Sequence, residues 1–128
     1  MTKEAVRTEA APAPFQGAPY SQAIKANGFV FVSGQLALHP GDKEIALEGI
    51  GAQTEQVLAN LKTILEAAGS SLDHIVKTTV FLQDLSDFPG MNEVYAAHVG
   101  STPPARSTVE VAKLPSGALV EIEAIALA

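Results

Sequence analysis

PPARSTVEVAKLPSGALVEIEAIALA, residues 103–128, contains two runs of alternating residues, 105–112 and 119–128. Alternation with a period of two is typical of a strand that has one buried face. The linking residues 114–117 include Pro115, which fixes φ, and a glycine, which accepts positive φ. The segment therefore predicts two strands joined as a hairpin, and the rest of the chain can be placed around this hairpin.

The predicted hairpin places charged and apolar side chains on opposite faces. In the second run the even-numbered residues are apolar: Val120, Ile122, Ala124 and Ala126. If Lys113 pairs with Ala118, the other face combines a cation, a hydroxyl and two carboxylates: Arg106, Thr108, Glu121 and Glu123. Such a set on a rigid hairpin predicts a functional site. A one-residue slip would move Arg106 to the face of Ile122 and remove this prediction.

The composition is that of one globular domain, 1–128, in which residues 1–14 are expected to form a loose N-terminal arm. The chain is 47% hydrophobic and 17% charged, which is enough apolar material for a core without disulfides or metal. The absence of cysteine excludes a disulfide framework, a thiolate zinc site and a cysteine nucleophile. The net charge of −6 disfavours nucleic-acid binding, because such binding requires clustered Lys and Arg. With no run of 18 apolar residues and no signal-peptide core, we expect no membrane association and a cytoplasmic location.

Two further strands are predicted near the N-terminus. Residues 23–26 and 29–33 flank an Asn-Gly pair, which is the strongest short-range signal for a hairpin because both residues tolerate positive φ. Gly34-Gln35 is expected to end the second strand, and residues 36–49 are expected to form a loop.

The middle of the chain predicts two helices separated by one strand. Residues 51–68 repeat apolar side chains at helical spacing, and Gly69 is placed to cap this helix. Residues 75–82 predict a strand with apolar side chains on both faces. Ser86 or Asp87 can cap a second helix. The stripe on that helix consists of Met91, Val94, Tyr95 and His98.

This order of elements predicts an α+β fold, a mixed sheet with two helices on one face. Two helices can cover only one face of the sheet, yet several strands are apolar on both faces, as Phe31 and Val32 illustrate. The uncovered face would be a larger apolar patch than monomers usually expose. We therefore expect self-association through that face.

Arg106 and Glu121 are the residues best suited to chemistry. Arg106 can hold a carboxylate through two parallel hydrogen bonds, although an arginine here can equally pair with a strand neighbour. Glu121 can act as a general base for water if its surroundings tune its pKa. A lone strand carboxylate is more commonly solvated, and Glu123 has the same parity. The three histidines show no ligand spacing and no phosphate-binding loop is present, so no metal and no cofactor are expected.

Several motifs occur as a set along the chain. They are GAPYSQA at 17–23, VSGQ at 32–35, IVKTTVFL at 75–82, PARS at 104–107 followed by VEV at 109–111, and LP at 114–115 with VEIEAIA at 120–126. In this order and spacing they resemble the RidA family, the reactive intermediate (enamine/imine) deaminases, also called L-PSP endoribonucleases. The resemblance covers nearly the whole chain after the arm.

The resemblance implies a chorismate-mutase-like α+β fold, assembled as a homotrimer whose sheets form a central β-barrel, with sites in clefts between subunits. It implies that Arg106 binds the substrate carboxylate and that Glu121 is the glutamate associated with the hydrolytic water. The resemblance also implies a substrate-binding cleft lined by Tyr20, Ser33, Gly34, Asn92 and Thr108. Thr108 stands where many members carry Cys, and Ala18 stands where a Gly usually precedes Pro-Tyr.

The activity that the resemblance implies is hydrolysis of the 2-imino acids 2-iminopropanoate and 2-iminobutanoate to 2-keto acids and ammonia, without a cofactor. Two other interpretations stay open. One is an RNA-cleaving translation inhibitor, which the acidic composition disfavours. The other is a noncatalytic ligand-binding or chaperone-like oligomer.

Overall fold

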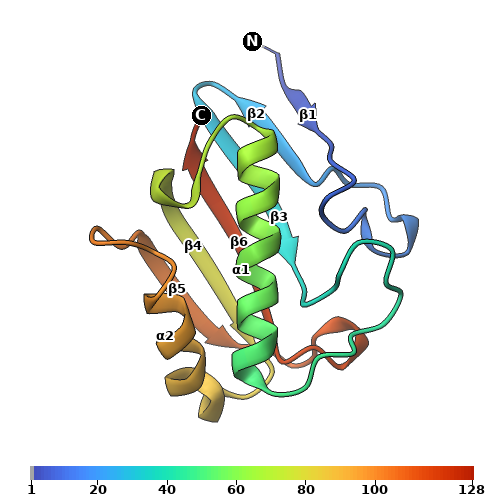
Figure 1. The fold of residues 1–128 in the computed structure, drawn as a ribbon, viewed down its shortest axis with the longest axis vertical. Helices are drawn as coiled ribbons and strands as arrows, with labels where there is room; N and C mark the ends of the chain where they lie inside the picture. Colours follow the sequence, from blue (N-terminus) through green and yellow to red (C-terminus); the bar gives the residue numbers. More distant parts are fainter. Residues whose placement is uncertain (1) are drawn as a thin grey trace.

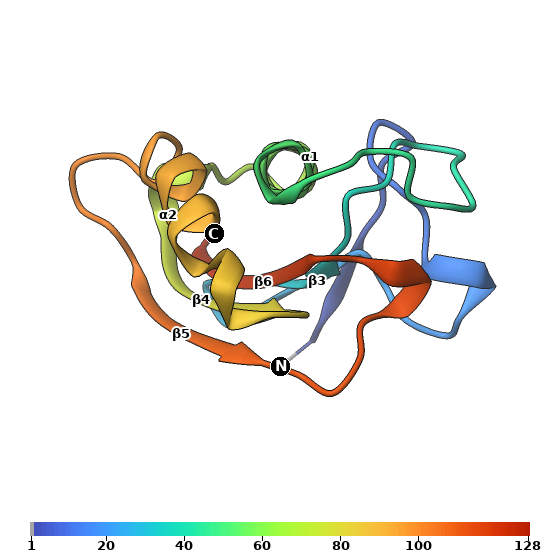
Figure 2. The ribbon, with the colours of Figure 1, turned by 90° about the horizontal axis from the view of Figure 1, so that it is seen from below.

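A six-stranded mixed sheet forms one layer of the protein, and two helices pack on one of its faces (Figure 2). This computed structural model describes residues 2–128. The elements, coloured along the chain in Figure 1, are β1 (Glu4–Val6), β2 (Ala23–Ala26), β3 (Phe29–Gln35), α1 (Ile50–Ala67), β4 (Ile75–Leu82), α2 (Phe88–Ala96), β5 (Ala105–Glu110) and β6 (Val120–Leu127). The strand order is β1-β2-β3-β6-β4-β5. Every neighbouring pair is antiparallel except β4 and β5, which are parallel.

β5 and β6 do not form the predicted hairpin, because β4 lies between them. β4 pairs in parallel with β5 and antiparallel with β6. It is long and apolar on both faces, as Val80 and Phe81 show, and such a strand is disfavoured at an exposed sheet edge. The predicted turn is present, since Ser116 and Gly117 both have positive φ. The connection 111–119 nevertheless joins two strands that are separated by β4.

The hairpin near the N-terminus is confirmed. β2 and β3 pair directly, and the turn residues Asn27 and Gly28 have φ values of 52° and 82°. Both residues of a two-residue type I′ turn require positive φ, which Asn and Gly tolerate. β3 continues to Gln35, beyond its predicted end, with an irregular register against β6 between Val32 and Gln35.

The two predicted helices are also confirmed. α1 buries one apolar stripe and ends before Gly69, which has a φ of 83°. The N–H of Ser70 donates to the carbonyl of Leu65 at 2.8 Å, as expected for a helix closed by a left-handed glycine. α2 begins next to Asp87, whose side chain makes no capping hydrogen bond. The Asp84 carboxylate caps the short turn before it instead.

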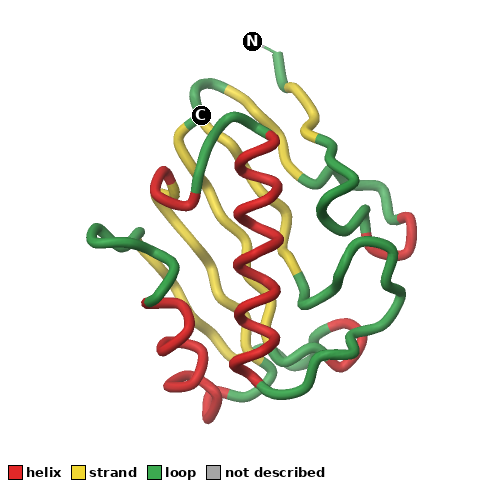
Figure 3. Tube along the Cα trace, in the orientation of Figure 1, coloured by secondary structure: helices red, strands yellow, loops and turns green. Residues whose placement is uncertain are grey.

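The loop 36–49 between β3 and α1 is irregular, as predicted (Figure 3). Its first residues are nevertheless buried. The side-chain amide of Asn60 in α1 donates to the carbonyls of Leu36 and Leu38 at 3.0 and 2.9 Å. Asn60 is itself 2% exposed, so these bonds satisfy a buried amide while fixing the loop.

Residues 2–14 pack against the sheet, so the prediction of a loose arm over residues 1–14 is corrected. Met1 lies outside the described residues. β1 pairs with β2 at the sheet edge, and Val6 is buried. Sequence analysis missed this because a three-residue edge strand has too few residues to show periodicity. The buried Gln22 amide holds the segment by hydrogen bonds to the backbone of Thr8, Ala11 and Pro12.

The face covered by α1 and α2 is the core, and the opposite face is open. The even-numbered residues of β6 are buried beneath the helices, as predicted. On the opposite face Phe31, Val109 and Leu127 are each more than 40% exposed. The prediction of an uncovered apolar sheet face is therefore confirmed. We call it the open face.

Candidate active site

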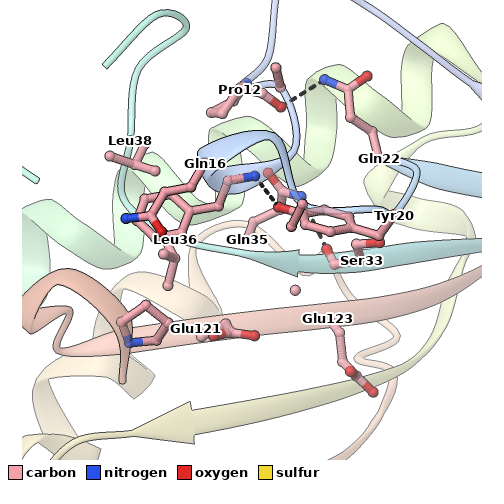
Figure 4. Close-up of a pocket in the computed structure, with 15 residues that line it drawn as sticks. Pro12, Gln16, Tyr20, Gln22, Ser33, Gln35, Leu36, Leu38, Glu121 and Glu123 are labelled. Carbon is pink, nitrogen blue, oxygen red and sulfur yellow. Dashed lines mark hydrogen bonds between the residues drawn. The ribbon is translucent and has the colours of Figure 1, made fainter. Parts of the chain in front are cut away.

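A pocket of about 610 Å³ lies between the N-terminal segment, the end of β3 and β6 (Figure 4). Three of the residues predicted to line a substrate site, Tyr20, Ser33 and Gly34, meet in it with Glu121, the predicted base for water. Glu123 adds a second carboxylate. Of the residues described by the structure, no Arg or Lys lines this pocket. We call it the acidic pocket, because it offers carboxylates and hydroxyls but no cation for an anionic ligand.

Gly34 makes room for the carboxylate of Glu121. A Cβ atom at Gly34 would lie 2.1 Å from Oε2 of Glu121 and 2.9 Å from its Cδ, distances that real Cβ atoms do not show. The φ of Gly34 lies outside the left-handed region, so its backbone conformation does not itself require glycine. What requires glycine here is the close approach of the Glu121 side chain to the backbone of β3.

The surroundings of Glu121 favour its protonated form. Burial raises the pKa of this carboxyl, and the negative charge of Glu123 raises it further. A base accepts a proton more effectively when its pKa lies closer to the working pH. Glu121 therefore has the environment expected of a general base for water.

Hydrogen bonds within the chain orient the two hydroxyls of the pocket. Ser33 Oγ donates to the carbonyl of Ser21 at 2.6 Å, which leaves its oxygen free to accept. The Tyr20 hydroxyl accepts from the N–H of Phe15 at 2.5 Å, so its own hydrogen remains available. The pocket thus offers one donor and one acceptor beside Glu121.

Arg106 lies outside the acidic pocket and packs against α2. Its guanidinium carbon is 5.3 Å from the ring centroid of Phe88 and 4.8 Å from that of Tyr95. Both contacts fall within the range of cation–π attraction. The Tyr95 ring is fixed in turn by a 2.6 Å hydrogen bond between its hydroxyl and Thr78 Oγ1. Within residues 2–128, no salt bridge involves Arg106, so its charge is held in place without a carboxylate partner.

Asn92 and Thr108 lie on the same side as Arg106. Asn92 follows Phe88 by four residues and precedes Tyr95 by three, which places all three on one face of α2. Thr108 is two residues beyond Arg106 in β5, and its buried Oγ1 has no hydrogen-bond partner. We call these five residues the cationic cluster.

The prediction that Arg106, Thr108, Glu121 and Glu123 share a sheet face is wrong. Arg106 pairs with Thr78, whose side chain is buried under the helices, whereas Glu121 pairs with Phe81 on the open face. β4 separates them, so the two backbones are also two strand spacings, roughly 10 Å, apart. The prediction assumed that the two strands pair directly, so that even-numbered residues of β5 face the same side as odd-numbered residues of β6. Because each strand pairs with β4 instead, even-numbered residues of both strands face the helices.

Sequence analysis missed several residues around both groups. Phe88 and Tyr95 enclose Arg106; their spacing of seven along one helix face was the signal that both contact the sheet. The apolar side of the acidic pocket was missed because its members lie in single 3-10 turns or in the loop 36–49, which are too short or too irregular to show a periodic pattern. They are Phe15, Leu36, Leu38 and Pro115.

No group of three or more His, Asp or Glu in residues 2–128 is arranged to hold a metal ion. His98 connects the helices instead: Nδ1 lies 2.9 Å from the carbonyl of Val94 and Nε2 lies 3.1 Å from the carboxylate of Glu55. Across the described part of the chain, no helix is both long and apolar enough to cross a membrane.

Comparisons with known proteins agree with this architecture. The chain is 47% identical to a solved RidA from the Antarctic bacterium Psychrobacter sp., with a TM-score of 0.91 over 98% of this chain and 99% of that one. It is 52% identical to "Reactive Intermediate Deaminase A, chloroplastic" of Arabidopsis thaliana, over 98% of this chain and 66% of the relative. It is 41% identical to the "2-iminobutanoate/2-iminopropanoate deaminase" of Mus musculus, over 99% of this chain and 93% of the relative.

The mixed sheet with two helices on one face is thus the α+β fold of solved RidA and L-PSP proteins. The sequence profile described as "Endoribonuclease L-PSP" matches residues 8–128. The chain belongs to this family, which includes proteins named as RidA, and the resemblance found in the sequence motifs is confirmed.

Proposed function

We propose that this protein hydrolyses reactive 2-imino acids, among them 2-iminopropanoate and 2-iminobutanoate, in sites completed by two copies of the chain. The relatives named as imine deaminases support the reaction. The observation that carries the proposal is that one chain holds the two halves of the expected site apart. The acidic pocket has a base but no cation, and Arg106 is a positioned cation without a carboxylate partner on the other side of the sheet.

A closed ring of three copies would bring the two halves of the site together and would also cover the open face. In such a ring each copy presents one surface to the next copy and a different surface to the previous one. The acidic pocket of one copy would meet the cationic cluster of its neighbour. The open faces would line a central barrel, which would bury the exposed Phe31 and Leu127.

In the proposed mechanism Arg106 binds the substrate carboxylate through paired hydrogen bonds, and Asn92 and Thr108 line the same side. Glu121 takes a proton from water as the water oxygen attacks the imine carbon and delivers it to the imine nitrogen, which gives a carbinolamine. Glu121 then takes the hydroxyl proton of the carbinolamine and passes it to the amino nitrogen. The C=O bond forms as the C–N bond breaks, and a 2-keto acid and ammonia leave. The protein supplies positioning and proton transfer, so the reaction needs no cofactor.

The test is complementation between two inactive variants. Arg106→Ala and Glu121→Gln chains are each assayed with a threonine dehydratase that generates the imine, and keto-acid release is timed. Each variant alone should be inactive. After the two are unfolded together in equal amounts and refolded, about one quarter of the sites in a random cyclic trimer should contain both intact residues.

Mixing the two assembled variants without unfolding is the matched control and should restore nothing. Failure of the co-refolded sample to recover activity, while it remains three times the 13.3 kDa chain mass, would refute a shared site. Full activity of either variant alone would remove that residue from the mechanism.

A further inference from the structure

The acidic pocket has an apolar end that the proposed chemistry does not use. Leu36 and Leu38 lie at one end of the pocket, and Tyr20 and Ser33 lie at the other (Figure 4). Leu36 and Leu38 belong to a small buried apolar cluster against which Phe15 packs, and all three line the pocket. We call Phe15, Leu36 and Leu38 the apolar wall.

The apolar wall is held in place by hydrogen bonds from both sides. The Asn60 amide donates to the carbonyls of Leu36 and Leu38. The N–H of Phe15 donates to the Tyr20 hydroxyl. An apolar surface that is already ordered can bind a ligand without the entropic cost of ordering it first.

The pocket is also larger than the shortest imino acids require. Its volume of about 610 Å³ lies within the range of pockets that bind drug-sized molecules. The side chain of 2-iminopropanoate is a single methyl group, which would leave most of the apolar wall without contact.

We infer that the apolar wall receives the side chain of the substrate, and that the protein favours 2-imino acids with longer apolar side chains over 2-iminopropanoate. This rests on the proposed function, which fixes the other two substituents. With the carboxylate bound by Arg106 of a neighbouring copy and the imine carbon beside Glu121, the side chain is the substituent left to occupy the apolar end. Each methylene that becomes buried there should raise kcat/KM about fourfold.

The experiment uses a homologous series in which only chain length changes. An L-amino-acid oxidase with catalase generates the imines of alanine, 2-aminobutyrate, norvaline and norleucine. The protein's kcat/KM is then measured from loss of the imine. Wild type should show a rise along the series up to the length that the pocket accommodates.

Phe15→Ala removes part of the apolar wall and leaves the acid–base groups in place. The preference for the norleucine imine over the alanine imine should fall by about tenfold in this variant, as expected for a hydrophobic pocket that loses contacts. Val111→Ala is the matched control, since Val111 packs against the same apolar cluster but does not line the pocket. It should keep the wild-type preference.

Calorimetric titration with pyruvate and 2-oxohexanoate separates this inference from the proposed function. Tighter binding of 2-oxohexanoate by wild type, lost in Phe15→Ala, supports the apolar wall even if no imine is hydrolysed, in which case only the proposed function fails. Active wild type with equal or falling kcat/KM along the series overturns the inference and leaves the proposed function intact. So does a preference that Phe15→Ala and Val111→Ala change equally.

Discussion

Replacement of Gly34 by alanine should lower the rate of imine hydrolysis strongly while leaving the fold intact. The added methyl group would lie 2.1 Å from Oε2 of Glu121, whereas ordinary contacts begin at 3.4 Å. The carboxylate is the end of a flexible side chain and can move away, and the φ of Gly34 is one that alanine accepts. The strain is therefore relieved by displacing the proposed base and not by unfolding the strand.

The expected loss follows from the size of that displacement. Misplacing a reacting group by about 1 Å costs roughly a hundredfold in rate, which corresponds to about 2.7 kcal/mol of the activation barrier. The free energy of unfolding should change by no more than about 1 kcal/mol, because Gly→Ala at a compatible φ restricts mainly the unfolded chain. The effect should fall on kcat more than on KM, since Arg106 is untouched.

The assay is imine hydrolysis coupled to a dehydratase, beside urea unfolding of the same samples. Gly51→Ala is the matched control, because a Cβ there lies 4.0 Å from Val94, an ordinary contact, and Gly51 is in α1 away from the acidic pocket. Wild-type kcat/KM in Gly34→Ala would refute the reasoning that the close approach of Gly34 positions Glu121. An equal loss in both glycine variants would indicate a general effect of substitution.

Four further outcomes are expected. Arg106→Lys should lower kcat/KM by roughly a hundredfold, because lysine keeps the charge but loses the planar two-pronged geometry; an unchanged value would argue against a carboxylate clamp. kcat/KM should fall as the pH drops through the raised pKa of Glu121. Glu123→Gln should shift this fall to lower pH without removing it, because burial is the larger cause of the raised pKa; pH–rate profiles of both proteins test this. A raised pKa means that the folded state binds the Glu121 proton more readily than the unfolded state, so the contribution of this group to stability is lost as pH rises through the folded pKa. Glu121→Gln should then gain stability over wild type with rising pH, and parallel unfolding curves across that range would contradict this. Phe31→Asp should give particles of 13.3 kDa in light scattering, since it places a charge on the open face; an intact trimer would show that this face is not the contact.

Local elements could be predicted because their signals lie in neighbouring residues. The Asn27-Gly28 turn, the stripe of α1 with Gly69 behind it, and the strand 75–82 each depend on φ preferences or periodicity within a few residues. The open apolar face followed from the same patterns, because two helices cover one face of a sheet.

The pairing of strands could not be predicted with the same certainty. The two runs in 103–128 have the alternation and turn residues of a hairpin, and nothing within them reveals that β4 lies between. The only signal was in β4 itself, because a long strand that is apolar on both faces is disfavoured at a sheet edge. A change of pairing partner also changes which side chains share a face, because the register between two paired strands decides which residues of each point to the same side.

The sequence by itself determined which residue types are present for chemistry: an arginine, a glutamate in a strand, hydroxyls and no cysteine. It could not determine which of these residues lie together and which lie on opposite faces of the sheet. Only the tertiary structure placed Tyr20, Ser33 and Glu121 in one pocket and Arg106 beside Phe88 and Tyr95 on the other side of the sheet. The physical reason is that side-chain type is a local property, whereas the face a strand residue occupies depends on the neighbours that the whole chain supplies.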